Sequence, residues 1–382
     1  MPDMRFAPAP VLLARSGAGG LNQTSVRSHN ERLVLDLLRR EKTLSRFEIG
    51  QHTGLSAQTI SVLVRALLKD GLLSEEQLSR GRVGPPTTPF SLNADGAFAL
   101  GAYIGVRVID VCLLDFRGNL RGTLRRPIGP DGLGDQVVAL SDELLGSAPP
   151  PVRERALGVG LAINRVHWGA PAAERRGGWA PGIGLDDIEN RITGASGLAC
   201  FIVDDATSAA IGDILYGERA DRFVYCHIGA EAQARVVLNG QAQVGFDDSL
   251  VVLPGLATLG RALKEARVAD DGVWLGNELP PEAAGLFEEW AQTMAKCITS
   301  AMTGLLAFLD VPYLVLVAPL APGELGALAA SIDAAFAGAG LAVPTAIGHN
   351  AQWAKASGAA ASVMSARFSK GWSEAEDQVT NA

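Results

Sequence analysis

Two patterns of hydrophobic and polar positions divide the chain. From about residue 25 to residue 71, apolar residues recur at intervals of about three or four, as they do in amphipathic helices. From about residue 97 onward, short apolar runs alternate with helical stretches. The first pattern predicts a small helical domain, and the second predicts a larger α/β body. Residues 1–24 are rich in Pro, Gly and Ala without any periodicity, so we expect a flexible tail there.

The helical region opens with two helices whose boundaries are marked in the sequence. Leu33, Val34, Leu37 and Leu38 form one apolar face of a helix that spans about residues 25–41. A second, short helix follows at the sequence Ser-Arg-Phe-Glu of residues 45–48, which has the spacing of a capping box. This helix is expected to end near residue 52.

A third helix follows a short glycine turn. Gly54 can adopt the positive φ that the turn requires, Ser56 caps a helix over Ala57–Asp70, and Gly71 ends it. The positions that face the core are Ile60, Leu63, Val64 and Leu67. Two helices joined in this way form a helix-turn-helix unit, in which the start of the second helix meets base edges of DNA.

Candidate DNA contacts therefore gather at the starts of these helices. Gln58 can donate to and accept from adenine, and Arg65 lies about two turns further along the same helix. Hydroxyl groups on the same turn suit either phosphates or bases. The predicted DNA-binding residues of the helices are Ser45, Arg46, Ser56, Gln58, Thr59, Ser61 and Arg65.

The residues after the third helix predict a wing. The stretch from residue 74 to residue 85 reads as a β-hairpin whose tip carries Arg80 and Arg82 between glycines. A narrow tip with arginines fits a minor groove or the phosphate backbone, so we add both residues to the predicted DNA contacts. The alternative is a plain helical hairpin followed by a solvated loop.

A strand hairpin occurs twice in the body. The apolar runs Ala97–Gly105 and Val108–Asp115 predict paired strands, and Phe223–Gly229 with Ala234–Leu238 repeats them about 125 residues later. The turn Asn239–Gly240 favours a further hairpin. Helical patterns separate these runs, so the repetition predicts two similar α/β lobes.

Charge is distributed unevenly between the two regions. The whole chain of 382 residues has a net charge of -8, yet residues 1–90 hold 12 Lys and Arg against 8 Asp and Glu. A small basic head on an acidic body is typical of a DNA-binding module attached to a sensory or enzymatic domain. Chance surface charge is the alternative reading.

Cysteine spacing and hydropathy limit the classes of protein to which this chain can belong. The 4 Cys lie far apart and form no C-x-x-C motif, which excludes a disulfide scaffold and suits a reducing compartment. No secretory signal and no apolar stretch of membrane-spanning length is recognisable. We therefore expect a cytoplasmic protein without membrane association.

From about residue 22 onward the chain resembles the ROK family, which comprises repressors and sugar kinases. The matching motifs of the head are Arg27-x-x-Asn30-x-x-x-Val34-Leu35, Ser45-Arg46, Thr53-Gly54-Leu55-Ser56, Thr59-Ile60-Ser61, Gly71-Leu72 and Gly81-Arg82. Those of the body are Leu114-Asp115-Phe116-x-Gly118, Gly158-Val159-Gly160-Leu161, Gly178-Trp179, Val203-Asp204-Asp205-Ala206, Ile228-Gly229 and Gly358-Ala359-Ala360.

The resemblance implies an α/β fold with a winged helix-turn-helix ahead of a two-lobed, actin-like (ribonuclease-H-like) ATPase body. We expect a flexible tail at 1–24, the winged helix-turn-helix at 25–92, the first lobe at 93–220 and the second at 221–382. The C-terminal helix is expected to return to the first lobe.

The phosphate loops depart from those of active family members. The family's first loop is Asp-x-Gly-Gly-Thr, whereas this chain has Tyr103-Ile104-Gly105-Val106-Arg107. The second, glycine-rich loop keeps only Gly229, and its Glu231 would repel a triphosphate. Backbone amides must approach phosphates closely, and added Cβ atoms prevent this. We therefore expect no ATP binding in the family's usual mode, no enzymatic activity and no cofactor.

The metal site of the family is also missing. The stretch from residue 245 to residue 254 contains no His and no Glu of the family's sugar-binding and zinc-binding motif, and the family's cysteine cluster is absent. A structural zinc site needs about four N or S ligands. We expect no bound metal.

Two adjacent carboxylates remain at the family's sugar site. By resemblance, Asp205 aligns with the catalytic base and Asp204 with a sugar-binding Asn. The pair could hold a polyol by hydrogen bonds, or it could simply cap the helix that follows, with Asp205 as the N-cap. The candidate ligand-binding residues are Gly178, Trp179, Asp204 and Asp205. Further polar or aromatic groups expected around the former cleft are Arg107, His167, Trp168, His227, Glu231 and Arg235, and they could equally be ordinary residues of a decayed site.

These observations favour a sequence-specific DNA-binding transcription regulator. We expect a repressor of genes for a carbohydrate or related small metabolite, with effector sensing in a catalytically degenerate body. Its expected partners are an operator in double-stranded DNA, a sugar-like effector and a second copy of the chain, in a homodimer or higher oligomer. Two alternatives stay open: a sugar kinase with an attached DNA-binding head, and a DNA-binding dimer that responds to no ligand.

Overall fold

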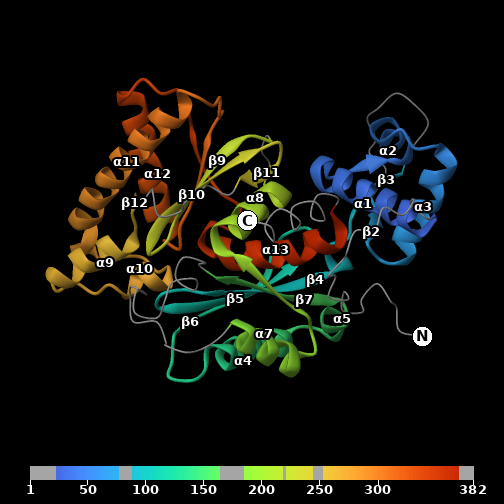
Figure 1. Cartoon of the computed structure of the whole chain (residues 1–382), viewed down its shortest axis with the longest axis horizontal. Helices are drawn as coiled ribbons and strands as arrows, with labels where there is room; N and C mark the ends of the chain where they lie inside the picture. Colours follow the sequence, from blue (N-terminus) through green and yellow to red (C-terminus); the bar gives the residue numbers. More distant parts are fainter. Residues whose placement is uncertain (1–22, 77–87, 164–184, 218–220, 244–252, 370–382) are drawn as a thin grey trace.

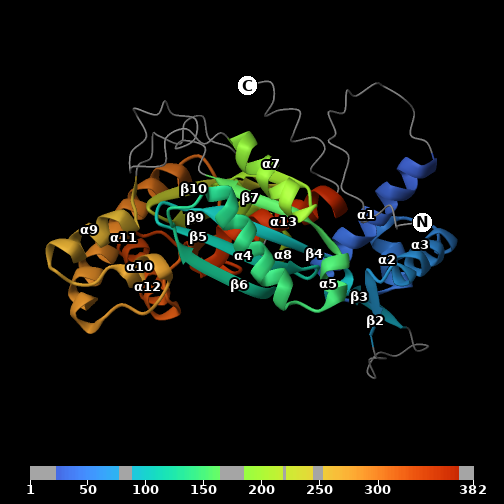
Figure 2. The same cartoon turned by 90° about the horizontal axis from the view of Figure 1, so that it is seen from below.

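The computed structural model describes residues 23–76, 88–163, 185–217, 221–243 and 253–369. These residues form one small sheet in an N-terminal head and one larger sheet in each of two body lobes. Figure 1 and Figure 2 show the head at one end of the molecule and the second lobe at the other. Among the described residues, no helix combines the length and the apolar character needed to cross a membrane.

The head is a three-helix unit closed by a small antiparallel sheet. Its elements are α1 (Gln23–Glu41), β1 (Leu44–Ser45), α2 (Arg46–Thr53), α3 (Ala57–Lys69), β2 (Leu73–Glu75) and β3 (Pro89–Leu92). The sheet order is β1-β3-β2, and Leu73 lies opposite Leu92. The predicted order of three helices followed by a strand pair is therefore confirmed for the described residues.

The apolar face of α1 is wider than the sequence pattern predicts. Val34, Leu35 and Leu38 are fully buried, whereas Leu33 and Leu37 are only partly covered. The reason is that α1 packs on the head and also on two helices of the body, α8 (Asp205–Tyr216) and α13 (Ala354–Phe368), so two sides of the helix are covered. The same position buries Arg39, which is 6% exposed.

The first lobe contains a five-stranded sheet with helices on both faces. The strands are β4 (Phe98–Ile104), β5 (Val108–Asp115), β6 (Leu120–Pro127), β7 (Ala156–Ile163) and β8 (Cys200–Asp204), in the order β6-β5-β4-β7-β8. The helices of this lobe are α4 (Leu133–Ser147), α5 (Pro150–Glu154), α7 (Leu185–Ser196) and α8 (Asp205–Tyr216). Helices α4 and α7 pack together on one side of the sheet, below it in Figure 1.

The second lobe repeats the same strand order. Its strands are β9 (Phe223–Ile228), β10 (Glu231–Leu238), β11 (Gln241–Gln243), β12 (Leu253–Pro254), β13 (Leu314–Val317) and β14 (Thr345–Ile347). The order β11-β10-β9-β13-β14 matches that of the first lobe, with β12 added beside β10. In both lobes an antiparallel hairpin leads into parallel strands. The duplication predicted from the repeated hairpin is confirmed.

The helices of the second lobe cover its outer face. They are α9 (Leu256–Glu265), α10 (Asp271–Leu275), α11 (Ala284–Leu306) and α12 (Pro322–Gly338), and they pack with the sheet around one large apolar core. On the opposite face of this sheet, Ala209 and Ala210 of α8 pack against Phe223 and Val315. Helix α8 therefore lies between the two lobes.

The last helix, α13 (Ala354–Phe368), returns to the first lobe and packs on β4, β7 and α8. The approach is backbone to backbone. A Cβ added at Gly101 would overlap the carbonyl oxygen of Ala356, and one added at Gly160 would overlap that of Ala359. Figure 1 shows α13 running through the middle of the molecule toward the head. Because glycines let it sit this close to the sheet, α13 has little room to shift independently.

The head shares its apolar core with the body. One continuous cluster joins Val34 and Leu67 of the head to Phe116, which directly follows β5, and to Phe368 of α13. The rings of Phe116 and Phe368 have centroids 4.8 Å apart. Nη1 of Arg155 donates to the carbonyl oxygens of Asp95 at 3.2 Å and Gly96 at 3.3 Å, beside the end of the head. The head is thus packed against the body through side chains of both.

Candidate nucleic-acid interface and interlobe cleft

Helix α3 presents a well-defined exposed face. The cap predicted at its start is present, since Oγ of Ser56 accepts a hydrogen bond from the amide of Thr59 at 3.2 Å. The turn before it places Gly54 at φ 69, as predicted. The side chains on the exposed face of α3 are Gln58, Val62, Arg65 and Lys69. They follow one another at helical spacing, so they form one stripe along the helix.

The other residues predicted to contact DNA from the helices differ in exposure and in hydrogen bonding. Ser45 is 6% exposed, and its hydroxyl is engaged with Glu48 in the predicted capping box of α2. Arg46 is exposed, and its guanidinium carbon lies 4.7 Å from the centre of the Phe90 ring. The hydroxyl of Ser61 donates to the carbonyl oxygen of Ala57 at 2.8 Å.

Arg80 and Arg82, the predicted tip of the wing, lie outside the described residues. Strands β2 and β3 on either side of them pair antiparallel, with Ser74 opposite Ser91 and Glu75 opposite Phe90. The second of these strands, Pro89–Leu92, begins after residue 85, where the predicted hairpin is expected to end. The contribution of the two arginines therefore stays a prediction.

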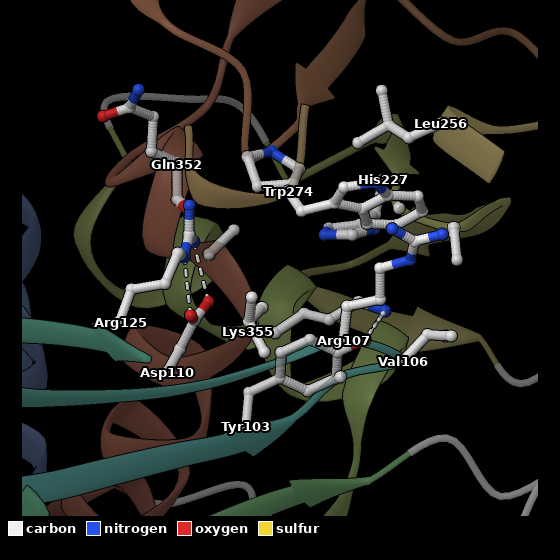
Figure 3. Close-up of a pocket in the computed structure, with 16 residues that line it drawn as sticks. Tyr103, Val106, Arg107, Asp110, Arg125, His227, Leu256, Trp274, Gln352 and Lys355 are labelled. Carbon is white, nitrogen blue, oxygen red and sulfur yellow. Dashed lines mark hydrogen bonds and ion pairs between the residues drawn. The ribbon is translucent and has the colours of Figure 1, made fainter. Parts of the chain in front are cut away.

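A pocket lies between the two lobes, where the hairpin turns after β4 and after β9 face each other. Its volume of about 40 Å³ admits a few water molecules and is far below the ~300 Å³ of a typical ligand site. Figure 3 shows the labelled side chains that surround it. The polar and aromatic residues of its wall are Tyr103, Arg107, Asp110, Arg125, His227, Trp274, Gln352 and Lys355.

Lys355 is the central charge of this cleft, and the sequence reasoning missed it. Its Nζ forms an ion pair with Oδ2 of Asp205 and lies 3.3 Å from the Tyr103 hydroxyl and 3.4 Å from Oε1 of Gln233. Burial lowers the pKa of Lys355, but the neighbouring Asp205 and Tyr103 outweigh this effect and raise the pKa above its ordinary value. Lys355 therefore stays charged. The signal available in the sequence was a lone lysine in an otherwise small and apolar helix.

The helix cap and the buried ion pair of this site belong to two adjacent carboxylates, Asp204 and Asp205. Asp204 is the N-cap of α8, because its Oδ1 accepts from the amide of Thr207 at 2.8 Å, so the expectation that Asp205 caps the helix is wrong. Asp204 also forms an ion pair of 3.1 Å with Arg235. Asp205 is the first residue of the helix and is completely buried, with its carboxylate turned toward Lys355. The residue just before the first helical turn is the one whose side chain can reach the free amides of that turn. Asp204 is in this position, so it caps the helix.

Two arginines join the lobes across the pocket. Arg125 of β6 donates to both carboxylate oxygens of Asp110, at 2.6 and 2.7 Å, and to the carbonyl oxygen of Gln352 at 2.8 Å. Arg107 forms an ion pair of 3.1 Å with Asp270 of the second lobe, and its guanidinium carbon lies 4.8 Å from the centre of the Trp274 ring. Each positive charge of the pocket wall thus has a carboxylate partner.

His227 lies in the wall as an uncharged side chain. Burial lowers its pKa well below the usual range, and the nearby charges of Lys355 and Arg125 lower the pKa further. Its Nδ1 is buried and has no hydrogen-bond partner among the described residues, and the same holds for Oδ1 of Asp205. These two atoms are the places where a ligand could add a hydrogen bond.

In the two turns expected to correspond to phosphate loops, the glycine amides are used in hydrogen bonds within the turn. The amide of Gly105 donates to the carbonyl oxygen of Val108 at 2.9 Å, and the amide of Gly229 donates to that of Glu231 at 3.1 Å. These amides therefore complete β-hairpins. A phosphate-binding loop needs amides that are free to point at the ligand.

Several predicted ligand residues fall outside the described part of the chain. These are Gly178 and Trp179, together with His167 and Trp168. Glu231 is exposed at the start of β10, and Arg235 is buried against Asp204. Within the described ranges, no group of three or more His, Cys, Asp and Glu is placed to hold a metal ion.

Comparisons with known proteins agree with this two-part architecture. The family model described as winged helix-turn-helix DNA-binding matches residues 27–74. The chain is 24% identical over 319 residues to a protein of Sinorhizobium fredii, covering 78% of this chain and 80% of that one. It is 21% identical over 231 residues to the xylose repressor of Bacillus subtilis, covering 59% of each. The match thus spans less than two thirds of the repressor.

Solved structures show the same fold. A ROK-family transcriptional regulator, a homologue of the Escherichia coli MLC protein, matches with a TM-score of 0.59 and 14% identity, covering 90% of this chain and 97% of that one. A ROK-family glucokinase from Streptomyces griseus matches with a TM-score of 0.50 and 15% identity, covering 69% and 98%. The regulator match includes the head, and the kinase match corresponds in length to the body.

Proposed function

We propose that this chain, which has the winged helix-turn-helix and two-lobed body of the ROK-family transcriptional regulators, is a sequence-specific DNA-binding repressor. The observation that carries the proposal is the exposed stripe on α3, where Gln58, Arg65 and Lys69 lie on one face of a capped helix. These side chains are of the types that bind adenine, guanine and phosphates. The relatives named xylose repressors support repression and genes of carbohydrate metabolism as the target.

The proposal includes a dimer that binds a palindromic operator in the cytoplasm. Helix-turn-helix proteins of this kind place two recognition helices about one turn of DNA apart, which requires two copies of the head. Arg80 and Arg82, at the predicted tip of the wing, would add contacts to the minor groove or to the phosphates.

We assign the body a sensing role and no kinase activity. Asp205, which aligns with a catalytic base, is paired with Lys355, and Tyr103 stands where active kinases have an Asp. A carboxylate that is held by a buried ammonium is a poor acceptor for the proton of a sugar hydroxyl. The closed turns at Gly105 and Gly229 support the same assignment, because phosphoryl transfer depends on a held triphosphate.

Helix α13 offers a mechanical route from the cleft to the head. Lys355 lies in its first turn, and its last residue, Phe368, packs on Phe116. The hydroxyl of Ser369, just after the helix, accepts a hydrogen bond from Nη1 of Arg39 in α1 at 3.1 Å. A helix of 15 residues spans about 22 Å, so one rigid element touches both sites. An effector that forms a hydrogen bond with Asp205 and displaces Lys355 would therefore shift α1 through α13.

The test of the DNA-binding role begins by selecting bound fragments from a random DNA library with the full chain. Affinity for the selected sequence is then measured by fluorescence anisotropy at two salt concentrations. We expect binding that weakens with salt and weakens about tenfold or more in Arg65→Ala. The matched control is Arg261→Ala, which removes an exposed arginine from α9 of the body. Failure to enrich any sequence, with a folded protein, would overturn the proposal.

The kinase alternative has its own test. A coupled ATPase assay with a panel of hexoses and pentoses should give no turnover above that of Asp205→Asn. Sugar-dependent turnover that Asp205→Asn abolishes would replace the sensing role with catalysis. Thermal unfolding with the same sugars then separates a sensor, which is stabilised by its ligand, from a dimer that responds to none.

A further inference from the structure

Val62 is an exposed apolar side chain in the middle of the recognition helix. Among the described residues, only Phe47, Val62, Phe308 and Ile347 are large hydrophobic residues classed as exposed, and Val62 is 55% exposed. Its neighbours Leu63 and Val64 are buried in the core of the head. Val62 therefore contributes little to packing and adds an apolar group to a surface that is otherwise polar.

The side chains beside Val62 define what that surface can contact. Gln58 is one turn before Val62, and Arg65 and Lys69 are one and two turns after it, on the same exposed face. In the part of the chain that the structure describes, these three polar side chains make no hydrogen bond or ion pair. The face thus offers an amide, a branched alkyl group and two cations in a row.

The hydroxyl groups at the start of α3 are occupied within the helix. Ser56 and Thr59 contact each other through their hydroxyl oxygens at 2.9 Å, in addition to the cap. The hydroxyl proton of Ser61 is directed to the carbonyl oxygen of Ala57. The groups that remain free to read bases are therefore those of the stripe: Gln58, Val62 and Arg65.

We propose that Val62 selects thymine by contact with its 5-methyl group. This inference rests on the proposed DNA-binding function and adds a specificity-determining residue to it. The 5-methyl of thymine is the apolar group that a base pair presents in the major groove. Against cytosine, the isopropyl group of Val62 would cover the N4 amino group and leave its donor without a partner.

The spacing of the stripe places this thymine relative to the base read by Gln58. Four residues of helix correspond to a rise of about 6 Å, and base pairs follow one another at about 3.4 Å. The thymine contacted by Val62 therefore lies within about two base pairs of the adenine that Gln58 is suited to bind. A second copy of the chain repeats the arrangement in the other half-site.

The test replaces single thymines of the selected operator by deoxyuridine, which removes only the 5-methyl group. We expect one position in each half-site to weaken binding by the wild-type chain about fourfold, as the loss of one buried methyl implies. In Val62→Ser the same replacement should leave affinity unchanged, because the apolar partner is gone. Val62→Ile keeps a branched alkyl group and should keep the sensitivity to the methyl group.

Controls separate this inference from the DNA-binding function itself. Deoxyuridine placed outside the half-sites should not affect any of the proteins, and circular dichroism should show equal folding because position 62 is exposed. If the wild-type chain selects an operator, but every thymine replacement affects wild type and Val62→Ser equally, the role of Val62 is wrong and the regulator stands. If no operator is selected, the DNA-binding function fails first.

Discussion

The ammonium group of Lys355 in α13 and the carboxylate of Asp205 in α8 form a buried ion pair, although 150 residues separate them in the sequence. The pair lies at the starts of the two helices that run between the lobes. By resemblance, its carboxylate is the one expected at the position of the family's catalytic base. The pair also fixes the start of α13, whose other end contacts the head.

The energetics of this pair can be measured by a double-mutant cycle. Lys355→Met leaves Asp205 buried without its partner, so we expect the free energy of unfolding to fall by about 3–5 kcal/mol. Lys355→Met combined with Asp205→Asn should destabilise less than the two single changes added together, because the double variant buries no unpaired charge. Urea denaturation gives the four values.

The control for this cycle is the exposed pair of Arg126 and Glu143, whose side chains are 52% and 54% exposed. Arg126→Met should change the stability by less than about 0.5 kcal/mol. A Lys355→Met variant as stable as Arg126→Met would show that the buried pair contributes nothing.

Coupling between the cleft and the head predicts a long-range effect on DNA affinity. The folded double variant Lys355→Met with Asp205→Asn lacks the ion pair, so α13 is no longer held at that end. We expect its affinity for the selected operator to change by a factor of about five or more, the lower range of allosteric coupling. Anisotropy titration measures the change.

Two further variants test whether the change in operator affinity is transmitted through α13. Ser369→Ala, which removes the acceptor for Arg39, should add little to the double variant, since both changes act through α13. Lys264→Met, at a 54% exposed lysine paired with Asp270, should leave operator affinity unchanged. Equal affinities for the wild-type chain and the double variant would argue against a route through α13.

The close packing of α13 predicts strong sensitivity to a single methyl group. In Gly101→Ala the added Cβ overlaps the carbonyl oxygen of Ala356, so the helix must shift from the sheet. We expect a loss of about 3 kcal/mol or more in the free energy of unfolding. Gly304→Ala on the exposed side of α11 meets no atom within 4 Å and should stabilise by about 0.5–1 kcal/mol. Similar stabilities for the two variants would contradict the tight packing.

His227 predicts a pH dependence of stability. It is neutral when folded because burial depresses its pKa, whereas the unfolded side chain takes up a proton below about pH 6.5. Stability is therefore lost as the pH falls through this value, and between about pH 7 and pH 5.5 the loss from this one group is on the order of 1 kcal/mol. Between these two pH values, the free energy of unfolding of His227→Gln, measured by urea denaturation, should fall by that much less than the free energy of unfolding of the wild-type chain.

The pH experiment has an internal control. Burial raises the pKa of Asp110 and of Asp205, which acts in the opposite direction, but both groups are present in wild type and in His227→Gln. Their contribution therefore cancels in the difference. An identical slope in His227→Gln would mean that His227 titrates equally in both states.

Local chemistry was sufficient to predict much of the head. The cap at Ser56, the capping box of Ser45 and Glu48, and the positive φ of Gly54 each depend on residues within four positions of one another. Such interactions can be read directly from the chain. Val62 lies on the side of α3 opposite to the core residues Ile60, Leu63 and Val64, as the helical period requires.

The sequence by itself determined the order of the elements and the two repeated sheets, since hydrophobic periodicity and turn residues are local properties of the chain. The tertiary structure alone decided that Lys355 meets Asp205, that Asp204 rather than Asp205 caps α8, and that Ser369 reaches Arg39. These contacts join residues from different elements, and burial gives a charge its partner only after the chain has folded.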